Sequence, residues 1–309
     1  MRYLVALDEH KHFARAAQAC FVTQPALSNA IRALETEFAT PIVKRGRAFV
    51  GFTSEGQRIL ASARRMLYEE QLLKQDLNSI TGQPQGALHV GVVPTAEPIA
   101  ARFAAMLHDL HSGITPVVRA MSSAEIETGL GNLSLDLGLG FTERVKPSGV
   151  PLSTLAQYTE HYFLVRKAAS PGRAGSIQFA DPISWQAAAS LPLCLMTAEM
   201  HNRHIVDDAF KRAGTPVRPV LETNSILTLA LSAMGGKVCS VMPGALVGAV
   251  HGYGELQVHR LIDPEVKTPI GFMTLASDQP SRTLQAALAF AQDPAWLSHC
   301  ASHSGLLEG

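Results

Sequence analysis

Short apolar runs alternate with amphipathic segments of helical period from residue 86 to the C-terminus. This alternation is typical of strands that each lead into a helix covering a sheet, and it predicts an α/β fold built on a parallel sheet. The hydrophobic fraction of 47% supplies the apolar surface that such a core needs and argues against general disorder. The runs expected as strands are 87–93, 116–120, 135–140, 162–165, 193–196, 238–242 and 270–276.

A different pattern precedes this region, where two helical segments flank a tight connection at residues 21–23 that uses Val22 as an apolar plug. Thr23 is a good N-cap for the second helix, and Pro25 falls in its first turn, where the missing N–H costs little. This second helix carries apolar residues at the helical period, which predicts a single buried face. They are Leu27, Ile31, Leu34 and Phe38.

The opposite face of this helix presents side chains that can hydrogen-bond base edges and phosphates in the major groove of DNA. They are Gln24, Ser28, Asn29 and Arg32. The pattern predicts a helix-turn-helix.

Residues 41–52 follow with two short apolar runs around a basic glycine turn, which predicts a β-hairpin wing. Its tip residues Arg45 and Arg47 are expected to straddle the DNA backbone or enter the minor groove.

A small helical domain with a solvated basic hairpin is the alternative interpretation of this N-terminal part. The alignment of polar and basic residues opposite the core stripe disfavours it. Residues 1–65 hold ten Lys and Arg and five Asp and Glu, a net charge of +5, although the whole chain is neutral with 26 of each sign. A basic head on an acidic body is expected of a protein whose head meets a polyanion.

The N-terminal segment is not expected to be a signal peptide, because Asp8 and Glu9 interrupt its apolar start. No apolar window is long enough to predict a membrane span, so we expect a cytoplasmic protein with no membrane partner. The four cysteines are far apart and form no CxxC pair, which favours reduced thiols over a disulfide framework or a zinc ribbon. They are Cys20, Cys194, Cys239 and Cys300.

One long helix is predicted over residues 53–81, from the capping residue Thr53 to a Gly/Pro stop. Its apolar residues repeat every seven positions, and two more extend the row. The seven-residue repeat is Ile59, Met66, Leu73 and Ile80, and the additions are Ala63 and Leu77. Such a row pairs with a second helix or packs on its own domain, and the pattern alone leaves both open.

Small polar residues gather at four strand ends in the C-terminal region. Ligands of α/β folds bind beyond the carboxyl ends of strands, where helix N-termini offer free amides. Each cluster alone is more typical of a helix N-cap, but together they predict a cleft that holds a small anion. The candidate residues are Pro94 and Thr95, Ser122 and Ser123, Thr197, His201 and Asn202, and Asn224 and Ser225.

His201 and His204 lie three residues apart with Glu199 nearby, but zinc needs three or four converging ligands, so we expect no metal site. His201 is interpreted instead as a charge-bearing contact to an anionic effector. The chain has no GxSxG elbow and no GxxxxGK[ST] loop, and Gly129-x-Gly131 lacks a third glycine. We therefore expect neither an enzyme nor a cofactor.

The strings FARAAQACFVTQPALSNAIRALETEF, PIVKRG and FTSEG resemble the winged helix-turn-helix of LysR-type transcriptional regulators. The resemblance continues through GALHVGVVPT, SLDLGLG, LPLCL, ETNS and VCSVMPGAL, so it covers nearly the whole chain. It implies an α/β protein with a winged helix-turn-helix DNA-binding domain over 1–52, a linker and dimerisation helix with a hinge over 53–85, and an effector-binding domain over 86–309. That last domain is expected to be two-lobed and similar to periplasmic binding proteins, with one lobe at 86–157 and 264–300 and the other at 158–263.

The resemblance also implies DNA-facing positions at Thr23, Gln24, Pro25, Ser28 and Arg32. Asn29 stands where the family often has Arg, and Gly51 replaces a common wing charge, so base preference at those contacts is open. A homodimer or homotetramer that binds double-stranded DNA at a near-palindromic operator is implied as well. The strings MTAEMHNRHIVDDAF and VCSVMPGALVG are similar to regulators found beside formate dehydrogenase operons, which implies formate or another small carboxylate as the effector.

We interpret the chain as a DNA-binding transcriptional regulator that senses a small anionic metabolite. A cytoplasmic small-ligand-binding module is one alternative, and the basic head disfavours it. The DNA-reading head also resembles peroxide-sensing members of the same family, so a redox regulator of this fold is a second alternative. Such a switch needs two thiols that meet, whereas Cys194 and Cys239 lie inside apolar runs and are interpreted as inert core thiols.

Overall fold

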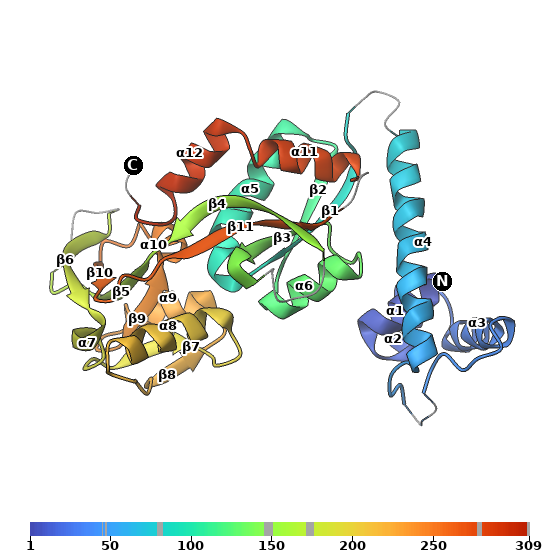
Figure 1. Cartoon of the computed structure of the whole chain (residues 1–309), viewed down its shortest axis with the longest axis horizontal. Helices are drawn as coiled ribbons and strands as arrows, with labels where there is room; N and C mark the ends of the chain where they lie inside the picture. Colours follow the sequence, from blue (N-terminus) through green and yellow to red (C-terminus); the bar gives the residue numbers. More distant parts are fainter. Residues whose placement is uncertain are drawn as a thin grey trace. The chain divides into compact units, whose positions relative to one another are not determined.

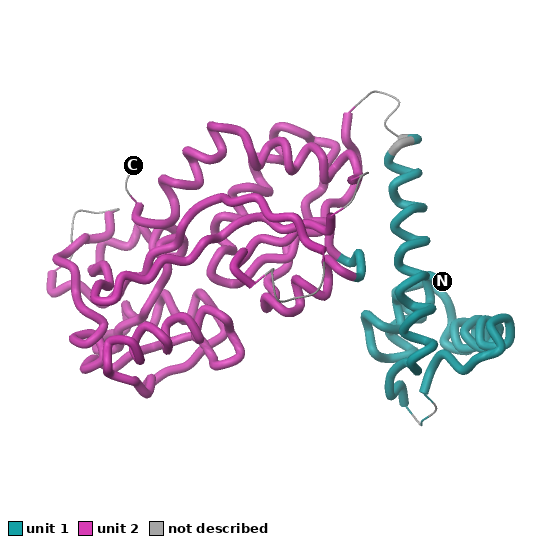
Figure 2. Tube along the Cα trace, in the orientation of Figure 1, with its two compact units in different colours: residues 1–82, 132–134 teal, residues 83–131, 135–309 magenta. Residues whose placement is uncertain are grey.

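The computed structural model describes residues 1–44, 46, 48–78, 83–144, 151–170, 176–276 and 280–307. The chain divides into two compact units, residues 1–82 with 132–134 and residues 83–131 with 135–309 (Figure 2). Within the described ranges, no helix is both long enough and apolar enough to cross a membrane.

The N-terminal unit contains three short helices and one long one (Figure 1). They are α1 (Arg2–His10), α2 (Phe13–Ala19), α3 (Gln24–Glu37) and α4 (Ser54–Asn78). As the sequence predicts, the Thr23 hydroxyl accepts a hydrogen bond from the Ala26 backbone N–H over 3.4 Å, and Pro25 lies in the first turn of α3. Leu27 and Ile31 are buried in the core that the helices share.

The prediction that Phe38 shares this buried face is wrong. α3 ends at Glu37, and Phe38 is its C-cap residue with 43% of its surface exposed. A residue beyond the last helical turn no longer follows the helical period, so the apolar stripe ends at Leu34, which packs against the core while partly buried.

The predicted wing is a minimal hairpin. In the described part of the hairpin, one bridge pairs Val43 with Phe52, and the Lys44 backbone N–H donates to the Gly51 carbonyl over 2.9 Å. The carboxylate of Glu35 in α3 accepts hydrogen bonds from the backbone N–H groups of Ile42, over 2.8 Å, and Val43, over 3.1 Å. This contact joins the start of the hairpin directly to α3.

The start of α4 lies against the same hairpin. The Thr53 hydroxyl accepts from the Gly56 backbone N–H over 2.9 Å and donates to the Pro41 carbonyl over 2.7 Å, so Thr53 caps the helix as predicted. A Cβ atom on Gly56 would overlap the Ile42 carbonyl oxygen and lie 2.9 Å from the Ile42 carbonyl carbon. Only glycine allows the helix and the hairpin backbone to approach this closely.

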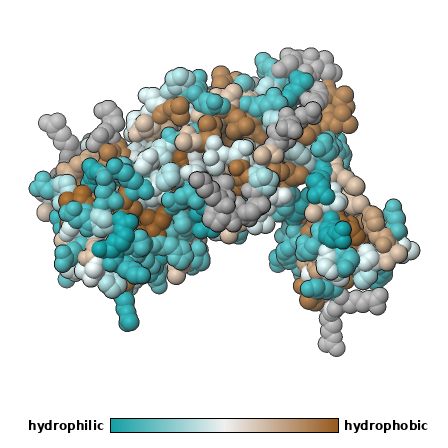
Figure 3. All heavy atoms as spheres, viewed as in Figure 1, coloured by the Kyte–Doolittle hydropathy of each residue, from teal (hydrophilic) through white to brown (hydrophobic). Residues whose placement is uncertain are grey.

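The apolar row of α4 has two parts. Ile59 packs against the core of the N-terminal unit and Ala63 is fully buried. Met66, Leu73 and Leu77 are 57%, 59% and 62% exposed, and Ile80 lies outside the described residues. Exposed apolar residues are not confined to α4, since brown patches also appear elsewhere on the face drawn in Figure 3. Met66, Leu73 and Leu77 are therefore largely open to solvent in the described part of this chain.

The first sheet of the C-terminal unit has the strand order β2-β1-β3-β11-β4. Its strands are β1 (Gly86–Val92), β2 (Ile114–Ala120), β3 (Leu137–Phe141), β4 (Leu152–Glu160) and β11 (Thr268–Leu275). β1 is parallel to β2 and β3, whereas β11 is antiparallel to both β3 and β4. We call this sheet and its helices lobe I. The helices are α5 (Glu97–Leu110), α6 (Ser123–Gly131), α11 (Arg282–Phe290) and α12 (Pro294–Ser302), with the 3-10 turns η1 (Pro94–Ala96) and η2 (Thr142–Arg144).

The second sheet, lobe II, has the order β6-β10-β5-β9-β7-β8. Its strands are β5 (Tyr162–Lys167), β6 (Gln178–Ser184), β7 (Leu193–Met196), β8 (Leu221–Thr223), β9 (Cys239–Pro243) and β10 (Leu256–Ile262). Its helices are α7 (Trp185–Ala188), α8 (His201–Arg212), α9 (Ile226–Ser232) and α10 (Gly244–Ala249). Separate apolar clusters pack on the two faces of this sheet.

Two segments connect the lobes, one between β4 and β5 and one between β10 and β11. At the first crossing, the buried carboxylate of Glu160 accepts hydrogen bonds from the backbone N–H groups of Ala245, over 3.3 Å, and Gly305, over 3.2 Å. The C-terminal end of the chain is therefore fastened to the strand that leaves lobe I.

The predicted α/β class is confirmed, but the expectation of a parallel sheet is wrong, because both sheets are mixed. β11 brings the chain back into lobe I antiparallel to β3 and β4. β5, the strand that enters lobe II, runs antiparallel to β9 and β10. All seven predicted strands are present within a few residues. The missed strands β4, β6, β8 and β10 are short or have polar residues between their apolar ones, so they contain no continuous apolar run.

Candidate functional site

The face of α3 opposite the core gathers the polar side chains that the sequence predicts for DNA contact. Ser28 is half-buried and the others are exposed: Thr23, Gln24, Pro25, Asn29 and Arg32. Arg32 Nη1 donates to Asn29 Oδ1 over 3.3 Å, which holds the guanidinium along the helix. Polar side chains therefore gather on this exposed face of α3, with Pro25 among them.

A groove of about 680 Å³ separates this helix from the hairpin. Arg32 and Lys44 place cations at its walls, and Thr36, Thr40 and Thr53 add hydroxyl groups. These are the groups that bind phosphate oxygens in protein–DNA interfaces. Arg45 and Arg47, which the sequence predicts at the hairpin tip, lie outside the described residues.

A second candidate site is a pocket where lobe I meets lobe II within the C-terminal unit. Six of the nine predicted effector residues line it: Pro94, Thr95, Ser122, Ser123, His201 and Asn202. Val93, Phe141, Met196 and Met200 complete the wall. The volume open to the centre of a water molecule is ≈ 10 Å³, which is space for about one water. This pocket admits only a very small ligand unless the lobes separate.

Lobe I supplies hydroxyl groups to this pocket. Ser123 is 9% exposed, and its Oγ is buried without a hydrogen-bond partner among the described residues. Thr95 is 4% exposed. Leaving a buried hydroxyl unpaired costs about 1–3 kcal/mol, so a ligand or a water that pairs with Ser123 gains this energy.

Ser122 has a different role, because it forms a capping box at the start of α6. Its hydroxyl and its backbone N–H both donate to Glu125 Oε2 over 2.8 Å, and its Oγ accepts from the Glu125 backbone N–H over 3.3 Å. Ser122 therefore fixes the helix end on which Ser123 sits.

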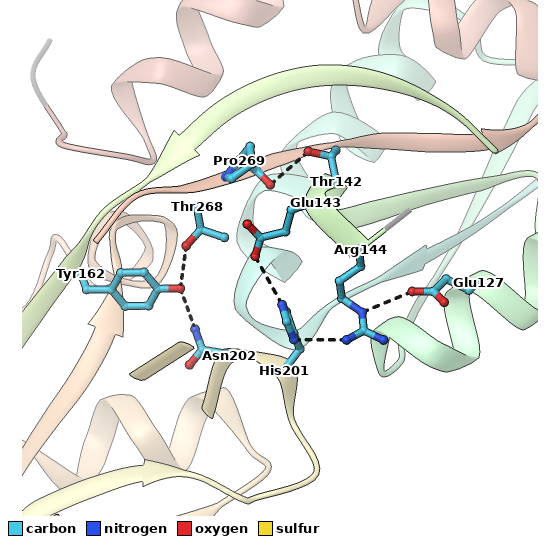
Figure 4. A network of polar contacts seen from close by, with 9 residues as sticks. All are labelled: Glu127, Thr142, Glu143, Arg144, Tyr162, His201, Asn202, Thr268 and Pro269. Carbon is cyan, nitrogen blue, oxygen red and sulfur yellow. Dashed lines mark hydrogen bonds and ion pairs between the residues drawn. The ribbon is translucent and has the colours of Figure 1, made fainter. Parts of the chain in front are cut away.

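Lobe II supplies an amide and an imidazole from the first turn of α8. Asn202 is buried, and its Nδ2 donates to the Tyr162 hydroxyl over 3.4 Å. The same hydroxyl lies 3.3 Å from Thr268 Oγ1 (Figure 4). This series of contacts joins α8 to β5 and β11, the strands that follow the two crossings between the lobes.

His201 lies between Glu143 and Arg144, two residues of lobe I (Figure 4). Its Nδ1 is 3.3 Å from Arg144 Nη1, and its Nε2 is 3.5 Å from Glu143 Oε1. Arg144 also pairs with Glu127, with 3.3 Å between Nε and Oε1. Because a guanidinium only donates hydrogen bonds, His201 Nδ1 accepts and the ring proton is on Nε2.

Burial and the neighbouring charge of Arg144 lower the pKa of His201, so the ring is neutral at pH 7. The lowered pKa disfavours a charged imidazole, and the contact of His201 to an anionic effector stays a prediction. Arg144, which contacts His201, is itself paired with Glu127.

Three predicted effector residues do not line this pocket. Thr197 donates its hydroxyl hydrogen to Glu199 Oε1 over 2.7 Å, Asn224 is exposed, and Ser225 caps α9 by accepting from the Thr228 backbone N–H over 3.3 Å. Conversely, sequence reasoning missed Phe141, Glu143 and Arg144. The signal was present, since these residues directly follow a predicted strand.

No described cysteine lines the pocket. Cys194, Cys239 and Cys300 are buried, and their burial raises the pKa of each thiol, to about 12 for Cys300. These thiols are therefore protonated and poor nucleophiles at neutral pH. Among the residues that the structure places, no three His, Cys, Asp or Glu side chains are grouped to hold a metal ion.

Two family models match this chain. The model described as "Bacterial regulatory helix-turn-helix protein, lysR family" matches residues 1–57, and the one described as "LysR substrate binding domain" matches residues 81–295. A hydrogen peroxide-inducible genes activator of Haemophilus influenzae is 43% identical over 98 residues, which are 32% of this chain and 33% of that protein. The match thus spans about a third of the length of this curated relative.

Other similarities extend over most of the chain. A probable hydrogen peroxide-inducible genes activator of Streptomyces viridosporus is 28% identical over 270 residues, covering 85% of this chain and 83% of the relative. The solved structure of a full-length OxyR variant from Pseudomonas aeruginosa superposes with a TM-score of 0.68 at 22% identity, covering 94% of this chain and 96% of that one. At this identity the structural match establishes the fold.

Proposed function

The chain belongs to the LysR family of bacterial transcriptional regulators, and from that membership we propose that it reads an operator through its N-terminal unit and senses a small anion in its C-terminal unit. It is a regulator and not an enzyme. In this proposal residues 1–52 bind DNA, residues 53–85 link and pair two chains, and residues 86–309 bind the effector.

DNA binding is supported by the polar face of α3 and the adjoining groove. A recognition helix enters the major groove with its N-terminal residues at the base edges. In this proposal Gln24, Ser28 and Arg32 of α3 take that role, and Lys44, which lines the same groove as Arg32, would meet a phosphate. Two such heads related by a two-fold axis fit a near-palindromic operator in double-stranded DNA.

Replacing Arg32 or Ser28 with alanine is expected to weaken binding to the native operator by about 1–3 kcal/mol, because each removes a contact to a base edge or a flanking phosphate. Arg47→Ala should instead weaken binding to all sequences and reduce the salt dependence by about one phosphate contact. A footprint on the DNA upstream of the chain's own gene locates the operator. Titrating that DNA with each variant at several salt concentrations measures both effects. Wild-type affinity in all three variants would contradict the assignment of α3 as the recognition helix.

The effector is a small carboxylate in our proposal, with formate as the smallest example. The observation that carries this is the pocket itself, where the unpaired Ser123 hydroxyl, Thr95 and Asn202 converge in space for about one water molecule. The N-terminus of α8 adds partial positive charge. Arg144 lies behind His201, which it contacts, and is itself paired with Glu127. Formate, with three heavy atoms, is larger than one water, so in this proposal the lobes separate slightly to admit it.

Thr95→Val and Ser123→Ala are each expected to weaken effector binding about tenfold, because each removes a hydroxyl donor to a charged ligand. The affinity of each variant for the operator in the absence of effector should be unchanged. Thr197→Val is the matched control, since Thr197 lies outside the pocket lining. Calorimetry of the full chain with formate, acetate and larger acids measures the affinities. A response restricted to large apolar ligands, or unchanged affinity in both pocket variants, would overturn the anion proposal.

Sensing of peroxide through a thiol is a second candidate, because the relatives from Haemophilus influenzae and Streptomyces viridosporus are named as peroxide-inducible activators. The burial of Cys194, Cys239 and Cys300 and a pocket wall without a described cysteine argue against it. We expect hydrogen peroxide to leave operator binding unchanged. A peroxide response that a single Cys→Ser substitution abolishes would establish the redox function instead.

A further inference from the structure

Phe21, in the connection between α2 and α3 (Figure 1), combines two unfavourable properties. Its φ of 56° is in the left-handed region, and the residue is 96% exposed. The Val22 backbone N–H donates to the Ala17 carbonyl over 3.0 Å, and the Phe21 N–H donates to the Gln18 carbonyl over 3.1 Å. This is the Schellman motif, which ends helices with glycine, or sometimes asparagine, at the position that Phe21 occupies.

The fold alone does not account for a phenylalanine here. A residue with a Cβ is strained in the left-handed conformation. A ring that is exposed to water does not offset this strain, because it buries almost no apolar surface. Ala39 takes the same conformation after α3, with a φ of 48°, but presents only a methyl group. Strained residues that the fold does not require are concentrated at functional sites.

The position of Phe21 indicates what the ring meets. Phe21 precedes the N-cap Thr23 by two residues and Gln24 by three, and both are exposed at the end of α3 that reads base edges in our proposal. The ring therefore extends the polar reading surface with an apolar one. In the major groove, the apolar group that side chains contact is the C5-methyl of thymine.

We propose that Phe21 is a specificity-determining residue that contacts a thymine methyl group at the edge of each operator half-site. This inference rests on the proposed DNA-binding function. In the free chain nothing offsets the strain at Phe21. In the complex the contact of the ring with DNA offsets it.

Four variants of the full chain test the contact. Phe21→Ala and Phe21→Asn remove the ring and are expected to lower operator affinity about tenfold, the effect of losing a small apolar contact. Phe21→Tyr keeps the ring and should retain near wild-type affinity. Phe179→Ala removes another exposed ring, 55% exposed on β6, and should leave affinity unchanged.

Thermal unfolding separates the proposed role from a structural one. Asparagine accepts the left-handed conformation, so Phe21→Asn should raise the unfolding midpoint of the N-terminal unit by a few degrees while DNA affinity falls. Phe21→Ala keeps most of the strain and should leave the midpoint nearly unchanged. A fall in the midpoint of both variants would mean that the ring supports the fold, and would overturn the proposal.

Replacing thymine with uracil, one position at a time, identifies the partner on the DNA. One position per half-site should weaken wild-type binding several-fold and have no effect on Phe21→Ala, which has already lost the contact. Equal sensitivity of both proteins at every position would exclude the methyl contact. Arg32→Ala separates failure of the Phe21 proposal from failure of the proposed function. If Arg32→Ala weakens operator binding and Phe21→Ala does not, only the Phe21 proposal fails. If the wild-type chain binds no operator, the proposed function fails.

Discussion

A Gly56→Ala variant is expected to lose operator binding, because the added methyl carbon would overlap the Ile42 carbonyl oxygen and lie 2.9 Å from the Ile42 carbonyl carbon. Both are backbone atoms and cannot rotate away. The start of α4 must therefore move from the hairpin and lose the hydrogen bonds of Thr53 to Pro41 and Ile42. Alanine gains about 1 kcal/mol over glycine in a helix, which offsets only part of a cost of about 3 kcal/mol or more.

Denaturant unfolding of the full chain, followed with a probe in the N-terminal unit, measures this loss. Gly252→Ala is the matched control, since a methyl group there meets no atom within 4 Å. The C-terminal unit should unfold as in the wild type in both variants. Wild-type stability and operator affinity for Gly56→Ala would show that the hairpin and α4 leave room for a methyl group between them.

Leu73→Asp is expected to separate paired chains and abolish cooperative operator binding. Leu73 lies between Met66 and Leu77 in the exposed half of the α4 row, and a carboxylate buried in a helix pair there costs several kcal/mol. Sedimentation should show smaller species than the wild type, which will also distinguish a dimer from a tetramer. Half-site DNA should still bind weakly, because the reading head is unchanged.

Ala61→Asp provides the control for charge, because Ala61 is exposed on α4 but faces away from this row at 100° per residue. It should leave the assembly intact. An unchanged oligomer in Leu73→Asp would mean that the exposed row does not pair two chains, and the pairing role proposed for residues 53–85 would have to be abandoned.

Local patterns made the N-terminal unit predictable. Thr23, Pro25 and the apolar residues Leu27 and Ile31 specify the start and the buried face of α3 by rules that act within a few residues. The Glu35 contact to the hairpin was not predictable in this way, because a carboxylate on a helix surface usually reaches solvent. It depends on where the chain turns seven residues later.

The lining of the pocket between the lobes was predictable at the ends of strands, but the contacts that join the two lobes were not. Thr95 and Ser123 follow predicted strands, and the topological rule for α/β folds brings them together. The contact between Arg144 and His201 joins residues 57 positions apart across two lobes. Nothing in either local sequence specifies that pairing, so the neutral state of His201 followed only from the structure.

The discontinuity of lobe I sets the order in which the chain can be completed during synthesis. β11 lies between β3 and β4, but it leaves the ribosome about 110 residues after β4, once all of lobe II has been made. Until β11 is made, β3 lacks one neighbour and β4 lacks its only one, and such unpaired strand edges can recruit other chains. The contact of Gly305 to Glu160 needs a still later part of the chain. Synthesis therefore completes the N-terminal unit long before lobe I.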